Sequence, residues 1–412
     1  MPGKICEIDI AETISPIWGV KRYDWLYVLI RYHREPIGWL SLSNPQHHPV
    51  ISERRLYEEI TEQLSWTIGL KLLRKQMFGS QAEQRITDPI SVVICTRDRV
   101  DLLAGCLKAV LGLDYPNYEV VVVDNAPSTD ATARLVASLP VRYVREDRPG
   151  LDWARNCGIA EAHHDIIAFT DDDVRVDRAW LRYIGNTFSD PEVMAVTGFI
   201  APAELESEAQ HLFELKYGGM GKGFSRRIFR KSELNTYDLL AAQAFGVGAN
   251  MSFRSRVFSD IGLFDVALDV GTPAGGGGDL DMFHRLVAKG HTLVYEPSAL
   301  VWHIHRRSQD FLRQQIYDNG RSFGSYLLTC VRNRTVSRRK ALAFAARQWF
   351  GRWIIPRLLR PRGFPRRLTL AELTGALRSP RAYSASQKRA KQLAALPNSP
   401  SMHPQHKRIS RW

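Results

Sequence analysis

The sequence predicts an α/β fold in which a mainly parallel sheet carries helices on both faces. From Ile90 onward, strand-like segments alternate with segments whose apolar residues recur at helical spacing. The strand segments, such as "ISVVICT" and "YEVVVVDNA", are apolar almost throughout, which is typical of strands buried on both faces. The chain of 412 residues is long enough for this domain and for smaller appended units.

Seven segments of the main domain follow one another along the chain. They are the strand "ISVVICT", the helix "DLLAGCLKAVLGL", the strand "YEVVVVDNA", the helix "DATARLVASL", the strand "VRYVRE", the helix "LDWARNCGIAEAH" and the strand "DIIAFTDDD". In sheets of this kind, ligands bind beyond the carboxyl ends of the strands. The polar residues that follow these strands are therefore the first candidates for a functional site.

The main domain is expected at residues 86–330, with further units on either side. Residues 1–85 predict a small α+β unit, with two strands in "DWLYVLIRYHREPIGWLSL" and a helix, capped by Ser52, in "SERRLYEEITEQLSWTIGLKLLRKQM". The polar stretch "GSQAEQRITDP" resembles a linker. Residues 331–385 predict a basic helical extension, and residues 386–412 a loose polar tail.

The net charge of +13 is concentrated in one segment. Between Asn319 and Ala371 the chain has thirteen basic residues and no Asp or Glu, which indicates a polyanionic partner. The stretch "KALAFAARQWFGRWIIPRLLRP" interleaves arginines with Trp and Leu, as in a basic amphipathic segment that lies on an anionic membrane surface. Aromatic side chains that stack on single-stranded nucleic acid would look similar. Binding of nucleic acid, by a domain without enzymatic activity, is therefore the alternative function.

The number and spacing of the cysteines indicate a reducing compartment. The five cysteines lie far apart with no CxxC pair, which argues against a zinc site and a disulfide framework. No signal peptide begins the sequence, and no run of eighteen uncharged apolar residues occurs. We expect a cytoplasmic protein, associated peripherally with the inner face of the cell membrane.

Three consecutive carboxylates, Asp171, Asp172 and Asp173, directly follow the apolar strand "IIAFT". A single Asp at this position would be read as the cap of a turn or helix. Three like charges at a strand end repel one another unless something positive lies there. Hard oxygen ligands of this kind suit Mg²⁺ or Mn²⁺, which can neutralise a diphosphate.

Two neighbouring strand ends carry candidates for nucleotide binding. The first presents the hydroxyl of Thr96 and the guanidinium groups of Arg97 and Arg99, and the second presents Asp124. A carboxylate can accept the imide N–H of uracil or thymine, while arginines can face the base or the phosphates. The alternative for Asp124 is that it only stabilises its turn.

The helix "LDWARNCGIA" adds Arg155 and Asn156, shortly before the aspartates along the chain. This position favours a contact with phosphate or sugar, although an ordinary exposed arginine is equally compatible with the pattern.

The segment "GTPAGGGGDLDMFHRLVAKG" predicts a mobile glycine loop followed by a helix. Asp279 is either a helix cap or a general base that deprotonates an acceptor hydroxyl while the loop closes. In "SALVWHIHRRSQD", the alternation of an extended segment places His303, His305 and Arg307 on one face. These groups are candidates for a further metal ligand or for diphosphate partners.

With these segments, residues 90 to about 306 resemble family 2 of the inverting glycosyltransferases, which have the GT-A fold, a Rossmann-like arrangement. Six motifs occur in the order found in the family: "ISVVICTRDR", "VVVVDNAPSTD", "GLDWARNCGI", "IIAFTDDDV", "GANMSFR" and "GGDLDMFHRL". The resemblance implies that Asp124 contacts the base, that Asp171 and Asp173 are the carboxylates of the DxD metal motif, and that Asp279 is the catalytic base. It also implies that His303 completes the metal site.

The chain departs from the family pattern at two positions. Arg97 stands where many members have an aromatic residue, and Gly278 replaces the usual Glu before the catalytic Asp. Asp281 therefore remains an alternative base to Asp279. The resemblance implies transfer of a hexosyl or related sugar from a UDP-, dTDP- or GDP-linked donor to a hydroxyl of a lipid-linked or cell-surface glycan. A nucleotidyltransferase is disfavoured because no Gly-rich basic loop follows the first strand.

Overall fold

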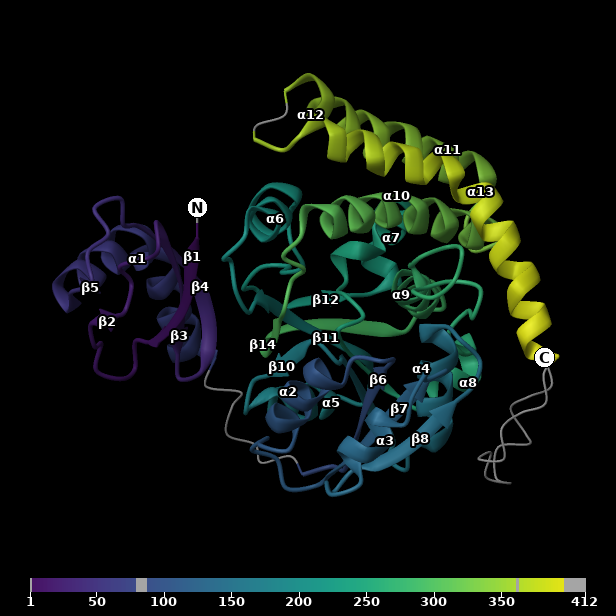
Figure 1. Cartoon of the computed structure of the whole chain (residues 1–412), viewed down its shortest axis with the longest axis horizontal. Helices are drawn as coiled ribbons and strands as arrows, with labels where there is room; N and C mark the ends of the chain where they lie inside the picture. Colours follow the sequence, from purple (N-terminus) through teal and green to yellow (C-terminus); the bar gives the residue numbers. More distant parts are fainter. Residues whose placement is uncertain (1, 79–86, 361–362, 396–412) are drawn as a thin grey trace.

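The computed structural model describes residues 2–78, 87–360 and 363–395, and within them the main domain is built on a nine-stranded sheet (Figure 1). The predicted α/β fold is confirmed. The strands β9 (Ile166–Asp171), β6 (Ile90–Thr96), β7 (Tyr118–Asn125) and β8 (Arg142–Glu146) are parallel neighbours in this order. Their carboxyl ends therefore meet at one edge of the sheet.

The other half of the sheet mixes strand directions. β13 (Asn250–Arg254) runs antiparallel between β9 and β11 (Val193–Pro202), and β11 pairs in parallel with β14 (Thr292–His303). The short strands β10 (Val174–Val176) and β12 (Arg227–Phe229) both pair antiparallel with β14. Because Val174 is opposite His303 in the register, the end of β14 lies beside the aspartate turn.

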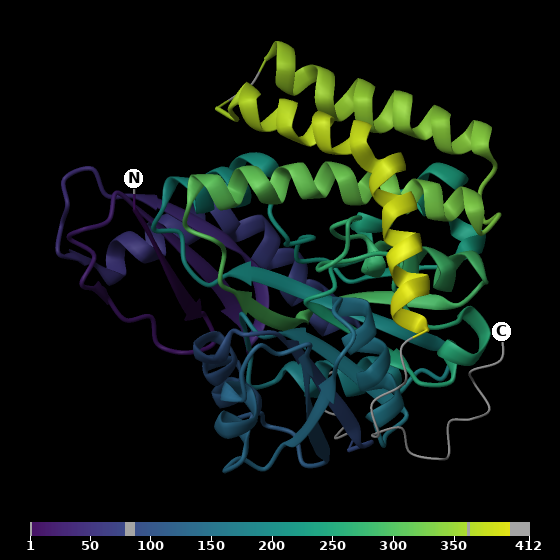
Figure 2. The same cartoon turned by 45° about the vertical axis from the view of Figure 1, so that its right-hand side comes forward.

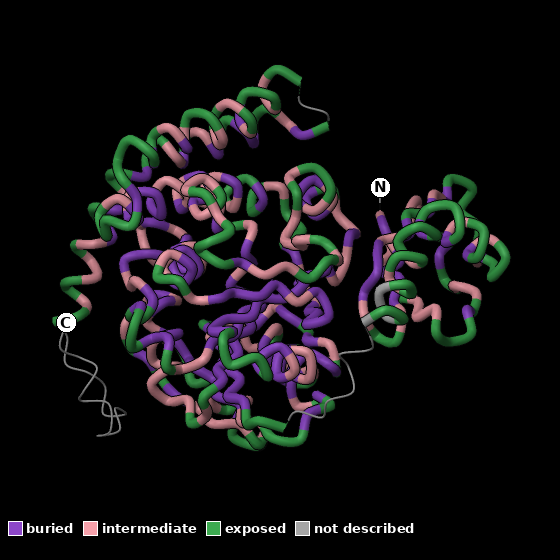
Figure 3. The backbone as a smooth tube through the Cα atoms, turned by 180° about the vertical axis from the view of Figure 1, so that it is seen from behind, coloured by how far each residue is buried: buried purple, intermediate pink, exposed green. Residues whose placement is uncertain are grey.

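Helices cover both faces of this sheet. One face packs on α2 (Val100–Val110), α3 (Ala131–Val136) and α5 (Trp180–Phe188), and the other on α4 (Leu151–Glu161), α8 (Val257–Ile261) and α9 (Gly278–Ala288). Val92 and Val122 face the first group, whereas Val93 and Val121 face the second, as the twofold repeat of a strand requires. The central strands are accordingly buried almost throughout (Figure 3).

The N-terminal unit is a three-stranded sheet, with the order β1 (Gly3–Asp9), β3 (Trp25–Tyr32), β4 (Glu35–Ser43), and one long helix, α1 (Glu53–Phe78). The short strands β2 (Ile17–Trp18) and β5 (Val50–Ile51) pair beside it. Leu26 and Val28 on β3 pack towards α1, whereas Leu29 belongs to the core of the main domain. Arg31 pairs with Asp177 of the main domain at 2.8 Å. This sheet is therefore packed on both faces.

Helices also cover the end of the main domain. They include α6 (Glu208–His211), a π-helical segment (Leu212–Tyr217), α7 (Thr236–Leu240), α10 (Gln309–Arg332), α11 (Arg338–Phe344), a second π-helical segment (Ala345–Ile354), α12 (Ile355–Leu359) and α13 (Arg366–Ala394). Figure 2 shows α13 running along α10 and then bending, and Pro380 lies inside this helix. A Cβ on Gly320 or Gly375 would lie within 2.0 Å of a backbone oxygen of the facing helix, so glycine permits this close packing.

Two sequence expectations for this region differ from the structure. Residues 386–394, which we expected in a loose tail, belong to α13, and Ser386 is buried there against the Ala267 carbonyl. The remaining tail, 396–412, and most of the expected linker, 79–86, lie outside the described residues. The extension also has no boundary at residue 330, because α10 continues through Arg332.

The aromatic residues of the extension do not all face outward as the membrane hypothesis assumed. Trp349 stacks on Phe323 with ring centroids 5.6 Å apart, and Trp353 donates a hydrogen bond to Glu372 at 2.9 Å. Ile354 is fully buried. Trp349 thus contacts α10, whereas Trp353 is bonded to α13 within the extension and contacts the main domain through Tyr217, with ring centroids 5.5 Å apart. In the described part of the extension, the exposed large apolar side chains are instead Leu342, Phe350, Ile355, Leu359, Leu370 and Leu377. Among the described residues, no helix has the length and apolar character needed to cross a bilayer.

Candidate active site

The predicted site residues of the first strands meet at the carboxyl edge of the sheet. In the parallel register, Thr96 at the end of β6 pairs with Asp124 of β7, and Cys95 pairs with Asp171 of β9. The loops after β6 and β7 are joined because Asp98 accepts hydrogen bonds from the backbone N–H and the hydroxyl of Ser128, at 2.9 and 2.8 Å. The strand order therefore brings these predicted residues together.

Asp124 is buried and only partly satisfied. The hydroxyl of Tyr143 donates to its Oδ2 at 3.1 Å, and the hydroxyl of Thr132 also interacts with this carboxylate, whereas Oδ1 makes no hydrogen bond of ordinary geometry to the described residues. Burial raises the pKa of this carboxyl above its ordinary value. Arg97 is half-exposed beside this edge of the sheet. A buried acceptor atom without a hydrogen bond, on the strand beside the one that Arg97 follows, fits recognition of a base N–H.

The aspartate turn is held by residues from the first loop. The hydroxyl of Thr96 donates to Asp172 at 2.8 Å, and Arg99 bridges Asp172 and Asp173 at 2.5 and 2.6 Å. Burial raises the pKa of Asp172 to about 6. For Asp173 burial acts in the same direction, but His303 and Arg99 outweigh it and lower the pKa. Arg99, which we predicted to face the base or phosphates, is thus engaged by two carboxylates.

Arg155 connects the aspartates with α9. Its guanidinium is almost fully buried, bonds Asp269, lies 3.1 Å from Asp152, and also interacts electrostatically with Asp171 and Asp279. Burial raises the pKa of Asp171 to about 7, and Arg155 opposes this rise. The predicted role of Arg155 as a donor contact stays a prediction, because its visible partners are these carboxylates.

The neighbouring Asn156 is committed to the protein backbone. Its side-chain amide donates to the carbonyl of Phe264 and accepts from the N–H of the same residue, both at 2.9 Å. This pair of bonds joins α4 to the segment after α8. A contact between Asn156 and the donor likewise stays a prediction.

Asp279 lies in the first turn of α9 and is not the helix cap, a position occupied by Gly277. Its carboxylate accepts hydrogen bonds from the N–H groups of Gly248 and Leu280, both at 2.8 Å. Burial, with the charge of Asp269, raises the pKa of Asp279. A partly buried carboxylate with a raised pKa has the character expected of a general base.

Asp281, the alternative base, is engaged elsewhere. It pairs with Arg285 at 2.7 Å, one turn along α9, and is 1% exposed. Arg285 in turn donates to the carbonyl of Leu263 after α8. This arrangement favours Asp279 over Asp281, because only Asp279 is linked to Arg155 and the aspartate strand.

The glycines before α9 permit close packing, which we did not predict. We expected them to serve mobility and not packing. A Cβ on Gly275 would lie 2.4 Å from the Arg321 guanidinium, one on Gly276 2.9 Å from Ser322, and one on Gly278 2.1 Å from Asp152. The expectation that packing plays no part was wrong, because the loop lies directly against α10 and the Asp152 carboxylate, and an added Cβ would displace these side chains.

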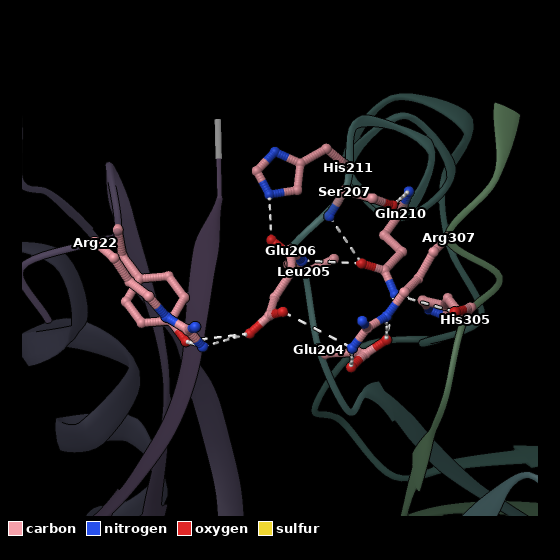
Figure 4. Close-up of polar contacts among 10 residues, drawn as sticks. Arg22, Glu204, Leu205, Glu206, Ser207, Gln210, His211, His305 and Arg307 are labelled. Atoms are coloured by element: carbon pink, nitrogen blue, oxygen red, sulfur yellow. Dashed lines mark hydrogen bonds and ion pairs between the residues drawn. The ribbon is translucent and has the colours of Figure 1, made fainter. Parts of the chain in front are cut away.

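His303 lies where its register with β10 predicts, next to the aspartates. Its Nε2 is 3.3 Å from Oδ1 of Asp173, and its Nδ1 is 3.0 Å from Nδ1 of His305. Burial lowers the pKa of His303 to about 4, so the imidazole is neutral near pH 7. Arg307 does not share this face as predicted, because it pairs with Glu204 at 2.7 Å (Figure 4).

The residues at this end fit a divalent cation that is completed by other ligands. Asp172 and Asp173 pair with Arg99, Asp171 interacts with Arg155, and the imidazole of His303 faces the Asp173 carboxylate. In the part of the chain that the structure describes, no three His, Cys, Asp or Glu side chains are grouped to hold a metal alone. Mg²⁺ is commonly bound by one or two carboxylates together with substrate phosphates and water.

Several residues of this region escaped the sequence reasoning. Asp152 and Asp269 bind Arg155, Glu214 binds His305, and Lys222 interacts electrostatically with Asp279 and Glu214. Burial lowers the pKa of Lys222 despite these carboxylates. Lys222 had a visible signal, the glycine-rich "GGMGKG", whereas Glu214, Asp152 and Asp269 carry no local pattern.

Comparison with known proteins agrees with this geometry. Residues 91–262 match the family described as glycosyl transferase family 2. Two relatives from Haloferax volcanii are both 25% identical. They are the glycosyltransferase AglE, aligned over 55% of this chain and 70% of the relative, and a glucosyl-dolichyl phosphate glucuronosyltransferase, aligned over 43% and 56%. The chain thus spans little more than half of the second relative's length.

A solved structure shows a more distant likeness. It is the mannosyltransferase PcManGT from Pyrobaculum calidifontis in complex with GDP-Man and Mn²⁺, which is 17% identical with a TM-score of 0.44 over 83% of this chain and 88% of that one. Residues 91–262, which carry the strand-end residues of the candidate site, thus form a region that matches glycosyl transferase family 2.

Proposed function

We propose that this protein transfers a sugar from a nucleoside diphosphate donor to a hydroxyl of a lipid-linked or polysaccharide acceptor, with inversion at the anomeric carbon. The proposal rests on one observation: two carboxylates from different elements both interact with the guanidinium of Arg155. Asp171, at the end of β9, and Asp279, at the start of α9, both interact with this guanidinium. Asp171 is suited to binding a diphosphate together with its cation, and Asp279 is suited to act as a general base.

The donor nucleotide lies over the ends of β6 and β7 in this proposal. The unpaired Oδ1 of Asp124 accepts an N–H of the base, and the half-exposed Arg97 covers the base or contacts a phosphate. UDP, dTDP and GDP all present an imide or amide N–H that a carboxylate can accept. The proposal therefore names the chemical class of donor and leaves its base to experiment.

Asp279 takes the proton of the acceptor hydroxyl as that oxygen attacks the anomeric carbon. The bond from this carbon to the diphosphate oxygen breaks at the opposite face, and its electron pair leaves with the nucleoside diphosphate. A single base is sufficient, because no covalent intermediate with the enzyme has to be resolved. The hydrogen bonds from Gly248 and Leu280 fix the carboxylate for this task.

A divalent cation, Mg²⁺ or Mn²⁺, would be held by Asp171, Asp173 and His303. When bound, it would neutralise the charge that develops on the diphosphate leaving group. Lys222, next to Asp279 and Glu214, supplies a further positive charge at this end of the site. Arg99 fixes the side chains of Asp172 and Asp173.

In this proposal, the protein binds its acceptor at an anionic membrane surface. A groove of about 890 Å³ between α10 and α13 is lined by Arg313, Arg367 and Arg378, and the exposed Leu370 and Leu377 lie on α13 beside it. Arginines next to exposed leucines suit phosphate headgroups above an apolar layer. The similar glucuronosyltransferase is named for a dolichyl phosphate-linked substrate, which supports an acceptor of this class.

The first test is isothermal titration of UDP, dTDP and GDP, each with and without Mn²⁺, into the protein and into a D171N/D173N variant. We expect one diphosphate to bind in a metal-dependent manner and the variant to lose this binding. Binding that ignores both metal and mutation would refute the proposed donor site.

The membrane contact has its own test, flotation with vesicles of phosphatidylglycerol and, separately, of phosphatidylcholine. We expect binding to the anionic vesicles alone, reduced in an R313Q/R367Q/R378Q variant. Tight binding to a single-stranded oligonucleotide, with no vesicle binding, would favour the nucleic-acid alternative, which the family match does not support.

A further inference from the structure

A row of hydrogen bonds leads from Glu214 through two histidines to the aspartate turn. Oε2 of Glu214 lies 3.0 Å from Nε2 of His305, and Nδ1 of His305 lies 3.0 Å from Nδ1 of His303. Nε2 of His303 then lies 3.3 Å from Oδ1 of Asp173. The side chains of these four residues are at most 13% exposed, so little water competes for the bonds.

The outer members of this row are fixed by their surroundings. The amide of Gln210 donates to the carbonyl of His305 at 3.0 Å, and the same side chain closes the cap of α6 (Figure 4). Glu214 lies in the π-helical segment that follows α6, a rare conformation that is often found at functional sites. Gly219, at φ +56°, lies so near Glu214 that a Cβ would come within 2.5 Å of the carboxylate.

A cation at His303 determines where the hydrogens of the two imidazoles lie. Nε2 of His303 can bind a cation only when it carries no hydrogen, so Nδ1 of His303 carries the hydrogen and donates to Nδ1 of His305. Nε2 of His305 then donates to the Glu214 carboxylate, and the bare Nε2 of His303 faces the Asp173 carboxylate. Two acceptors that face each other are stable when a cation lies between or beside them.

The opposite arrangement excludes the cation. If Nε2 of His303 carried the hydrogen and donated to Asp173, it could not bind a metal ion, so a cation at Asp173 selects the first arrangement. Ligating histidines generally use their second nitrogen in this way, hydrogen-bonded to a group that fixes tautomer and orientation.

We propose that Glu214 and His305 are positioning residues, which hold His303 with its bare Nε2 towards Asp173 and thereby strengthen divalent cation binding at this end of the site. This inference rests on the proposed metal-dependent function and adds two residues that no sequence motif assigns. Neither residue touches the reacting atoms, and their effect on the reaction passes through His303.

The test is the affinity of the full chain for Mn²⁺ alone, measured from the electron paramagnetic resonance signal of the free ion. We expect H305L and E214L each to weaken binding by about 10- to 100-fold, the usual range for the loss of such a partner. H305N should retain most of the affinity, because Oδ1 of Asn can take the place of Nδ1 as the acceptor for His303. E58Q is the control, because it removes only an exposed ion pair, with Arg54, on α1 of the N-terminal unit.

Each outcome separates this inference from the proposed function. If the unmodified protein binds Mn²⁺ and all three variants bind it equally well, the inference is wrong while the metal-dependent function stands. If the unmodified protein does not bind Mn²⁺, both are wrong. Thermal unfolding midpoints identify a variant that fails to fold. The Mn²⁺ affinities of H305N and H305L then test the inference at a single position.

Discussion

The contact between Gly278 and Asp152 predicts that one substitution will have opposite effects in two backgrounds. In the unmodified protein, a Cβ on Gly278 would lie 2.1 Å from Oδ2, 2.7 Å from Oδ1 and 2.8 Å from Cγ of Asp152. The carboxylate must therefore retreat by roughly 1.3 Å to restore an ordinary contact of 3.4 Å. It cannot do so freely, because it is buried and pairs with Arg155.

The expected cost of G278A follows from this geometry. Forcing one extra methyl group into a packed interior costs about 1–3 kcal/mol. For a chain of 412 residues, with an unfolding entropy of about 2.1 cal/mol/K per residue, a change of this size lowers the unfolding midpoint by roughly 1–4 °C. In a D152A background all three obstructing atoms are absent, and G278A then replaces glycine in the first turn of a helix. Alanine is favoured over glycine in helices by about 0.5–1 kcal/mol, so the substitution becomes neutral or stabilising.

The assay is thermal unfolding of the four proteins of this cycle, followed by circular dichroism at 222 nm. G105A is the matched control, because Gly105 lies exposed inside α2 with no atom within 4 Å of the added Cβ. It should raise the midpoint slightly. If G278A lowers the midpoint equally with and without Asp152, the steric explanation for this glycine is wrong.

Three further predictions concern chemistry and packing. D279N should lower kcat by about 10²- to 10⁴-fold while nucleoside diphosphate binding, measured by titration, is retained. Because burial raises the pKa of Asp279 and the base acts unprotonated, the acid limb of the pH–rate profile should lie above the ordinary Asp value of about 4; a limb at or below it would contradict the assignment. G375A, whose Cβ would lie 2.0 Å from the Tyr317 carbonyl oxygen, should lower the unfolding midpoint and leave nucleotide binding unchanged; an unchanged midpoint would mean that α10 and α13 separate without cost.

The order of the elements and the location of the site could be predicted because both depend on local pattern and topology. Apolar strands that alternate with helices give a parallel sheet, and parallel strands bring their following residues to one edge. Thr96, Asp124 and Asp171 therefore lie together as expected. The position of His303 depended on the resemblance, because the pairing of β14 with β10 has no local signature.

The partners of individual side chains could not be predicted, because they depend on distant packing. Nothing near Arg99 indicates that it bridges two aspartates more than seventy positions away, and nothing near Asn156 indicates its bonds to Phe264. The glycines before α9 show the same limit, because small residues are needed there where the loop lies close to α10. Glycine-rich sequence is equally compatible with mobility and with close packing.

The N-terminal unit shows why an appended unit cannot be separated from a site by sequence alone. Its strand β3 is apolar on both faces, which is explained only when α1 lies on one face and the main domain on the other. The N–H of Gly3 donates to the carbonyl of Leu205 at 2.7 Å, and Arg22 pairs with Glu206 at 3.1 Å (Figure 4). The loop that receives these contacts leads into α6 and then to Glu214. The unit therefore supports the segment from which the row of hydrogen bonds to His303 begins.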